Sequence, residues 1–304
     1  MKRDFLALSD LGKEGISPIL DLSLSLAKSR KTAAHPKPLA GLTAALIFEK
    51  ASTRTRVSLE IAVHELGGHP IVLTSQGSQL ARGEPIADTA RVLDRMVDVI
   101  ALRTFGGDRL NELAKVAKVP VINALTDDAH PLQLLADLYT VRNARGKLAG
   151  LRYAWVGDGN NMARSWIEAA GMLGLDLHLA CPAGFEPPST EVDLARRAGA
   201  KVTIVDDPAA ACRGADVIST DVWASMGQED EQERRKRAFA GFRVTRDLVA
   251  AARPDVVVLH CLPAHRGEEI DADVVEGSRS FIWDQAEARL HTCKAVLAWV
   301  LGRG

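Results

Sequence analysis

Hydrophobic residues recur along the chain in two alternating patterns. Short apolar runs have the length of buried strands, and each is followed by a longer stretch with helical spacing. Gly67 ends the helix that begins near Ser52, and Pro85 opens the next. Strands are predicted at residues 44–48, 71–74, 99–104, 119–122, 153–156, 176–180, 201–205, 216–219, 255–260 and 281–283. Further helices are predicted at residues 109–117, 131–144 and 285–301.

Strands that alternate with helices in this way predict parallel sheets covered by helices on both faces. A chain of 304 residues, at about 150 residues per domain, has room for two such domains. The expected fold is therefore α/β, with two doubly wound parallel-sheet domains joined by interdomain helices. We expect a first domain at residues 1–140, with the C-terminal helix 285–304 packing back on it, and a second at residues 141–284.

Composition narrows the class of protein. Lysine and arginine total 38 against 39 aspartate and glutamate residues, so no global field favours nucleic acid as a partner. Apolar runs such as residues 256–259 are far shorter than the roughly 20 residues that a membrane helix needs. The four cysteines lie far apart, without zinc-finger spacing, so neither a disulfide framework nor a metal site is expected. The start of the chain lacks a signal-peptide pattern, and a cytoplasmic location is expected.

A run of charges at residues 229–237 places acidic residues before basic ones. The spacing pairs Asp230 with Arg234, Glu231 with Arg235 and Glu233 with Arg237, one helical turn apart. The pattern predicts a solvated helix.

The segment from Phe48 to Arg56 is the strongest candidate for an anion site. A strand ends there, and a helix begins with the sequence Ser52-Thr53-Arg54-Thr55. A helix N-terminus offers unpaired N–H groups to an anion, although the hydroxyls could instead cap the helix. Arg103 at the end of a later strand and His130 before a helix are expected to converge on this anion, because the carboxyl ends of parallel strands line one crevice. Taken alone, a histidine such as His130 is more often structural.

The segment from Gly157 to Met162 also follows a strand and opens a helix. It carries half of a dinucleotide-binding fingerprint, with Met162 in place of the third glycine. An NAD-dependent dehydrogenase is therefore an alternative function. Asn160 and Asn161 could either cap the helix or bind a small polar ligand.

Two late segments follow predicted strands and bring further polar groups to the carboxyl edge. One runs from Asp221 to Gly227 and the other from His260 to Gly267. Cys261 in the second segment is either a nucleophile or an inert buried thiol.

Together these motifs resemble the carbamoyltransferase family. The Ser-Thr-Arg-Thr-Arg segment and the sequence His-Pro-Leu-Gln-Leu-Leu-Ala-Asp from His130 to Asp137 are similar to the carbamoyl phosphate site of that family. Asp221 with Ser225-Met226-Gly227, and the sequence His-Cys-Leu-Pro from His260, resemble its ornithine branch. The motifs occur in the family's order between about Phe5 and Leu301.

The resemblance implies transfer of a carbamoyl group from carbamoyl phosphate to the side-chain amine of ornithine, which releases citrulline and phosphate. It implies no cofactor, and it implies a homotrimer in which Gln79 reaches the neighbouring subunit's site. The first domain would bind carbamoyl phosphate and the second ornithine. Putrescine or an N-acylated ornithine is an alternative acceptor, and a relative without activity is a further possibility.

The same resemblance assigns the site residues. Ala288 stands where relatives often have asparagine, which weakens the expected orientation of its neighbour Arg289. The catalytic residues would be Arg54, Arg103, His130 and Cys261. Carbamoyl phosphate would be bound by Ser52, Thr53, Arg54, Thr55, Gln79, Arg103, His130, Gln133, Cys261, Leu262 and Arg289. Ornithine would be bound by Asn161, Asp221, Ser225 and Met226.

Overall fold

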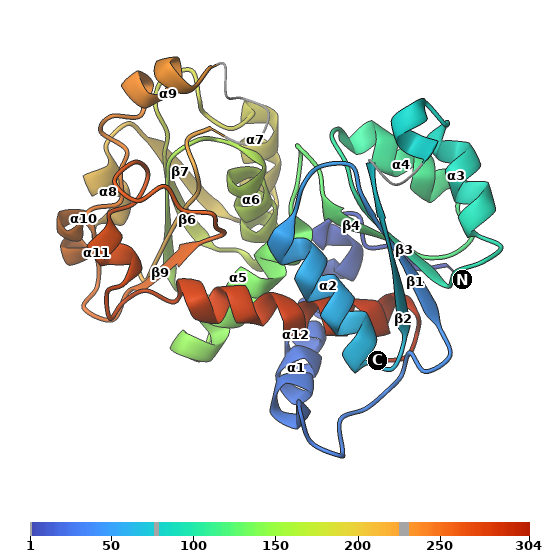
Figure 1. Ribbon diagram of the computed structural model, residues 1–304. Coiled ribbons are helices and arrows are strands. Elements are labelled where there is room, and N and C mark those ends of the chain that lie inside the picture. Colours follow the sequence, from blue (N-terminus) through green and yellow to red (C-terminus); the bar gives the residue numbers. More distant parts are fainter. Residues whose placement is uncertain (1, 76–78, 225–230) are drawn as a thin grey trace. The chain divides into compact units, whose positions relative to one another are not determined.

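The computed structural model describes residues 2–75, 79–224 and 231–304, and the chain divides into two compact units (Figure 1). Unit 1 comprises Met1–Ala136 and Glu287–Gly304, and unit 2 comprises Asp137–Ala286. Helix α5 (Pro131–Arg145) and helix α12 (Ile282–Val300) each contain a point at which the chain passes between units. The predicted fold class, two parallel α/β domains joined by helices, is confirmed.

Unit 1 contains a four-stranded parallel sheet with the order β2-β1-β3-β4. Because β1 is followed by β2 on one side and β3 pairs with its other side, the strand order reverses between β1 and β3. The strands are β1 (Thr43–Phe48), β2 (His69–Thr74), β3 (Val99–Arg103) and β4 (Val121–Leu125). The helices are η1 (Leu8–Leu11), α1 (Gly12–Ser29), α2 (Thr53–Glu65), η3 (Gln79–Arg82), α3 (Ile86–Leu93) and α4 (Gly107–Val116).

Unit 2 contains a five-stranded parallel sheet with the order β7-β6-β5-β8-β9, which reverses between β5 and β8. The strands are β5 (Arg152–Val156), β6 (Asp176–Ala180), β7 (Lys201–Val205), β8 (Val217–Thr220) and β9 (Val257–His260). The helices are α6 (Asn161–Leu173), α7 (Ser189–Arg197), α8 (Pro208–Cys212), α9 (Gln232–Ala238), α10 (Arg246–Ala251) and α11 (Ala272–Val275).

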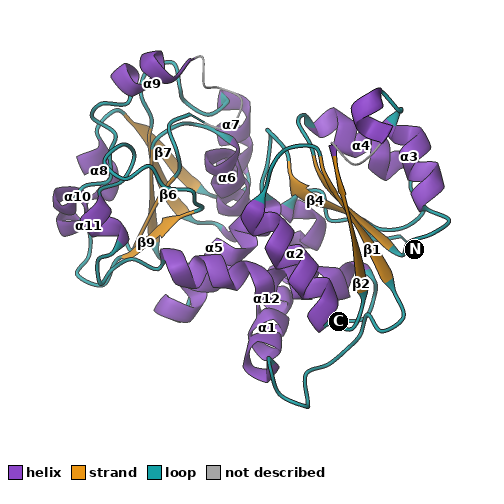
Figure 2. Cartoon of the chain, in the orientation of Figure 1, coloured by secondary structure: helices purple, strands orange, loops and turns teal. Residues whose placement is uncertain are grey.

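Helices cover both faces of each sheet, which is why the strands are continuous apolar runs (Figure 2). In unit 1, α2 covers one face, and α3 and α4 cover the other. In unit 2, α6 and α7 lie on one face, with α8, α10 and α11 on the other. All five residues of β3 are buried, as are all four of β8 and of β9. The polar residues of these three strands lie at or next to their carboxyl ends: Arg103, Ser219, Thr220 and His260.

Two predictions about late segments need correction. Residues 281–283 do not form a strand: Ser280 makes an isolated bridge to Val258, and the chain then enters α12 at Ile282. The charge run does form helix α9, and Glu231 pairs with Arg235 at 3.2 Å, but only 8% of the Arg235 side chain is exposed. The predicted solvated helix is therefore corrected: α9 has one buried side, which carries Arg235. Residues 229 and 230 lie outside the described residues.

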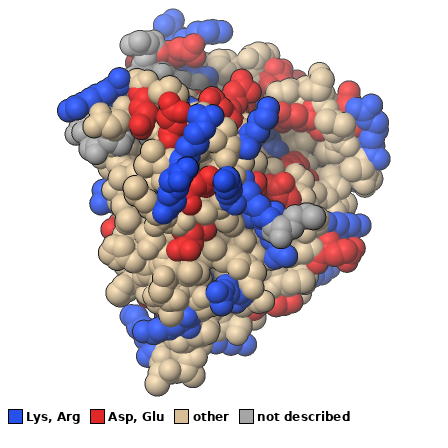
Figure 3. All heavy atoms as spheres, turned by 90° about the vertical axis from the view of Figure 1, so that its right-hand side faces the viewer, with Lys and Arg blue, Asp and Glu red and all other residues tan. Residues whose placement is uncertain are grey.

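Charged side chains of both signs are interspersed on the face drawn in Figure 3, in keeping with the net charge of −1. No helix in the described ranges is both long and apolar enough to cross a membrane.

Candidate functional site

The candidate anion site lies in unit 1 at the point where the strand order reverses. Arg103, the last residue of β3, is paired across the sheet with Phe48, the last residue of β1. The loop after β1 leads to Ser52, which takes the N-cap position of α2 with an extended backbone. In the described part of the chain its side chain accepts no capping hydrogen bond. Reversal points in parallel sheets are where ligands bind, and the predicted phosphate loop is at such a point.

Arg289 is fixed within unit 1 by two acceptors from other helices. Its Nη2 donates to Thr55 Oγ1 at 2.6 Å, and its Nη1 donates to Gln133 Oε1 at 3.0 Å. All three side chains are buried. Ala288 therefore does not leave Arg289 poorly oriented, because Thr55 and Gln133 hold its guanidinium in place.

Arg54 and Arg289 are close enough to Arg103 and His130 for their charges to lower the pKa of both. Burial, followed by the charges of Arg289 and Arg54, lowers the pKa of Arg103 to about 10. Burial, followed by Arg289, Arg103 and Arg54, holds the pKa of His130 well below its ordinary value. Arginines that repel one another in a partly buried site are stabilised by a bound anion. The arrangement of charge therefore supports an anion site.

The lowered pKa makes His130 a neutral imidazole at physiological pH. A neutral ring carries one N–H and can donate a hydrogen bond without accepting a proton first. His130 directly precedes α5, and its carbonyl accepts the N–H of Gln133 at 3.1 Å. The residue is suited to polarising a carbonyl group near the anion.

The second candidate cluster lies in unit 2, also where the strand order reverses. Asn160 caps α6 by accepting the N–H groups of Met162 and Ala163 at 2.9 and 3.3 Å. Its Nδ2 donates to Asp221 Oδ2 at 2.9 Å, which joins the loop after β5 to the loop after β8. Asn161 begins α6 beside it. Capping, one of the two roles left open for Asn160, is thus what the structure shows.

Cys261 lies next to the same aspartate. Its thiol donates to Asp221 Oδ1 at 2.9 Å, and Asp221 Oδ1 also accepts the N–H of Val222 at 2.8 Å. Leu262 follows with φ 60°, and its N–H donates to His260 Nδ1 at 2.8 Å. The thiol is therefore a hydrogen-bond donor held by a carboxylate.

The dinucleotide interpretation of the segment from Gly157 conflicts with local packing. A Cβ at Gly159 would lie 2.3 Å from Pro187 N and 2.7 Å from Phe185 O. The Gly159 N–H donates to that same carbonyl at 2.8 Å. The backbone of the chain therefore fills the space beside Gly159, and only glycine fits at this position.

The ion pair between Arg235 and Asp158, which lies near this cluster, was not predicted from the sequence. Arg235 Nη1 donates to Asp158 Oδ2 at 2.6 Å and to the Trp223 carbonyl at 2.8 Å. Burial raises the pKa of Asp158 above its ordinary value even with this partner. No local spacing links Asp158 to a residue 77 positions later, so no sequence signal predicted the pair.

Three further residues were predicted for the site, and the structure describes one of them. Gln79 lies exposed in η3 of unit 1. Ser225 and Met226 lie outside the described residues.

Comparison with known families matches both halves of the chain. The model described as the carbamoyl-P binding domain of aspartate/ornithine carbamoyltransferase matches residues 3–143. The model described as the Asp/Orn binding domain of the same family matches residues 149–300.

Individual relatives match over the full length. An ornithine carbamoyltransferase of Geobacter metallireducens is 54% identical over 302 residues, which is 99% of this chain and 100% of the relative. Among solved structures, ornithine carbamoyltransferase from Pyrococcus furiosus is 48% identical with a TM-score of 0.94, over 99% of this chain and 97% of that one. The anabolic ornithine carbamoyltransferase from Campylobacter jejuni is 38% identical with a TM-score of 0.92, and each chain is covered completely.

Proposed function

This chain belongs to the aspartate/ornithine carbamoyltransferase family, and we propose that it transfers the carbamoyl group of carbamoyl phosphate to the side-chain amine of L-ornithine. The products are L-citrulline and phosphate. The observation that carries the proposal is the cluster of Arg54, Arg103, Arg289 and His130 at the reversal point of a sheet. Relatives named for ornithine that match almost all of the chain favour ornithine over putrescine, an N-acylated ornithine or a dehydrogenase substrate.

Unit 1 is proposed to bind carbamoyl phosphate. The first turn of α2, with Ser52, Thr53, Arg54 and Thr55, would hold the phosphate through N–H groups, hydroxyls and a guanidinium. Arg103, His130 and Gln133 would contact the carbamoyl end. Arg289 would complete the site, since Thr55 and Gln133 already aim its guanidinium.

The mechanism follows from the charges. When a neutral amine attacks the carbamoyl carbon, the carbonyl oxygen becomes negative, and His130, Arg103 and Thr55 would stabilise that charge. The attacking nitrogen becomes positively charged as its bond to the carbamoyl carbon forms. The bond from that carbon to the phosphate oxygen then breaks, and the leaving phosphate would accept the proton that the nitrogen loses. No covalent intermediate with the protein is needed.

Unit 2 is proposed to bind ornithine. Asp221 would pair with the α-ammonium, and Asn161 would hydrogen-bond the α-carboxylate. Cys261 and Leu262 would lie beside the reacting amine and the carbamoyl group. The resemblance to the family adds Ser225 and Met226 to the residues that would bind ornithine.

The assembly and setting are part of the same proposal. We propose a homotrimer in which Gln79 contributes to the neighbouring subunit's site. We propose a biosynthetic role, which leads toward arginine; the relative from Campylobacter jejuni bears the word anabolic in its name. The cytoplasm is the proposed location, since in the described residues none of the four cysteines forms a disulfide.

An assay of citrulline formation with a panel of amines tests the proposal. Ornithine should be carbamoylated well ahead of putrescine, N-acetylornithine and aspartate. Asp221→Asn should lower kcat/KM for ornithine by at least about tenfold, or about 1.4 kcal/mol, with little change in the KM for carbamoyl phosphate. Faster turnover of putrescine by the unmodified protein would refute the acceptor assignment.

A further inference from the structure

Three loops of unit 1 carry the proposed carbamoyl phosphate site, and they follow three neighbouring strands. The loop after β1 leads to Arg54, Arg103 ends β3, and the loop after β4 leads to His130. The regular hydrogen bonds of the sheet stop at the strand ends, so the loops are held by individual backbone and side-chain contacts. The spacing of the three loops therefore depends on contacts beyond the sheet.

Glu49, the first residue after β1, joins the first two loops. Its N–H donates to the Arg103 carbonyl at 2.9 Å, and its carboxylate accepts the Thr104 hydroxyl. The Arg109 guanidinium holds that carboxylate at both oxygens, with Nε at 3.0 and 2.9 Å and Nη2 at 2.7 Å. Only 10% of the Glu49 side chain is exposed. A planar two-point contact of this kind fixes direction as well as distance.

The next residue joins the first loop to the third. Lys50 Nζ donates to Asp127 Oδ1 at 2.6 Å and lies 4.4 Å from the centre of the Phe105 ring. The Asp127 N–H donates to the Phe105 carbonyl at 2.7 Å. Glu49 and Lys50 thus link the loops that follow β1, β3 and β4, and Glu49 is the more buried of the two.

We infer that Glu49, held by Arg109, is a positioning residue for carbamoyl phosphate. The pair sets the distance between the first turn of α2 and the Arg103 backbone, and it does so without contact with substrate. This inference rests on the proposed function. Anion recognition by several groups at once is sensitive to such spacing, because each group must reach its oxygen in the same bound geometry.

Steady-state kinetics with Glu49→Gln, Arg109→Met and Arg109→Lys test the inference. The KM for carbamoyl phosphate should rise about tenfold in Glu49→Gln and Arg109→Met, while the KM for ornithine changes less than about twofold. Arg109→Lys should be intermediate, because an ammonium group keeps the charge without the fork. The double variant Glu49→Gln/Arg109→Met should be no worse than the more affected single variant. Inorganic phosphate, which should compete with carbamoyl phosphate, should inhibit the same variants more weakly than the unmodified protein.

Arg164 and Glu191 in unit 2 provide a matched control. Their contacts repeat the geometry, with Nε at 2.9 and 3.1 Å and Nη2 at 2.7 Å. Arg164→Met should lower the melting temperature to a similar degree and leave the KM for carbamoyl phosphate unchanged. If Glu49→Gln and Arg109→Met lower only the melting temperature, as the control does, the pair is merely structural and the inference is wrong. Absence of citrulline formation by the unmodified protein would instead overturn the proposed function.

Discussion

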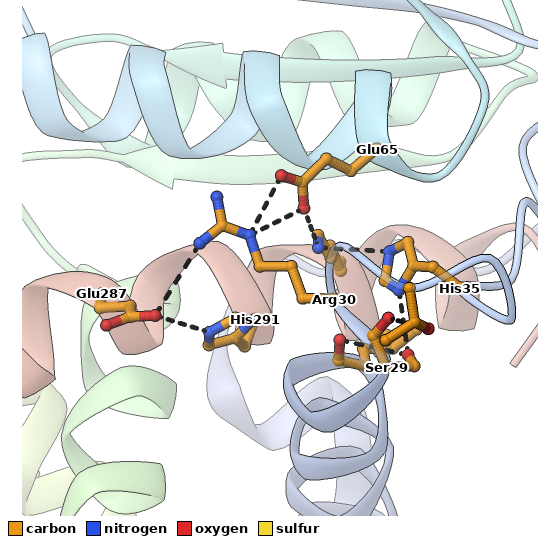
Figure 4. Close-up of polar contacts among 9 residues, drawn as sticks. Ser29, Arg30, His35, Glu65, Glu287 and His291 are labelled. Atoms are coloured by element: carbon orange, nitrogen blue, oxygen red, sulfur yellow. Dashed lines mark hydrogen bonds and ion pairs between the residues drawn. The ribbon is translucent and has the colours of Figure 1, made fainter.

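A buried lysine of unit 1 offers a quantitative test of how its helices are held together. The Lys294 side chain on α12 is 0% exposed and forms an ion pair with Glu65 at the end of α2. Lys294 also donates to His35 Nε2 at 3.3 Å, and Glu65 accepts the Arg30 Nε at 3.1 Å (Figure 4). The network continues from Arg30 to Glu287. The two ends of the Lys294–Glu65 pair are unequally buried, so their removal should have unequal costs.

The cost of each change follows from what it leaves behind. Lys294→Met keeps the apolar stem and removes a charge-assisted hydrogen bond worth about 1.5–3 kcal/mol. It also removes the unfavourable free energy of desolvating an ammonium group, which offsets part of that loss. Glu65 keeps Arg30 and is 21% exposed, so the expected loss is about 1–2 kcal/mol. Glu65→Gln leaves a fully buried ammonium group without a counter-ion, which should cost about 3–5 kcal/mol.

Equilibrium urea unfolding measures both losses. The double variant Lys294→Met/Glu65→Gln should be more stable than Glu65→Gln alone, because no charge is then stranded. Arg91→Met is a suitable control, since it breaks an exposed pair with Asp88 whose contribution should be below about 1 kcal/mol. A loss for Lys294→Met as large as that for Glu65→Gln, or additive losses in the double variant, would refute the reasoning.

Four further outcomes are expected. Arg54→Ala should retain the fold and lose about 2–4 kcal/mol of transition-state stabilisation, or thirty-fold to a thousand-fold in kcat/KM; near wild-type kinetics would mean that the phosphate site is misplaced. Cys261→Ser should raise the KM for ornithine and lower turnover without abolishing it, whereas a carbamoyl adduct on Cys261 in the mass spectrum would indicate covalent catalysis. His130→Asn should lower kcat but leave the pH at which activity rises unchanged, since burial already keeps His130 neutral; a shifted pH profile would contradict this. Burial and the charge of Lys294 lower the pKa of His35, so on acidification the unfolded chain takes up a proton before the folded chain does. Stability should therefore fall as the pH drops below about 6.5. Urea midpoints measured across this range should fall less for His35→Gln.

Much of the fold could be predicted from the sequence because local patterns determine it. The strands at Asp176–Ala180 and Lys201–Val205 have the predicted bounds, since each apolar run is flanked by turn residues. The segment at residues 281–283 was mistaken for a strand because its apolar run is too short to separate strand from helix by periodicity. There the long apolar face of α12 decides the outcome.

The candidate site was only partly predictable for the same physical reason. Strand ends are visible in sequence, and they led to Arg54, Arg103, His130 and Asp221. The contacts among the side chains of the site join distant positions: Arg289 reaches Thr55 across 234 positions. Such pairings depend on how helices pack around a sheet, and a single sequence holds no local signal for them.

The same packing explains why one basic residue of the site is neutral and the others are not. A lowered pKa of about 10 still leaves Arg103 protonated at neutral pH, because a guanidinium starts from a very high value. Burial and the charges of Arg289, Arg103 and Arg54 move the pKa of His130 well below its ordinary value, and an imidazole already starts near 6.5. One electrostatic environment therefore yields two kinds of donor. Charged arginines suit the phosphate, and a neutral N–H suits a carbonyl oxygen that gains its negative charge only as the amine attacks.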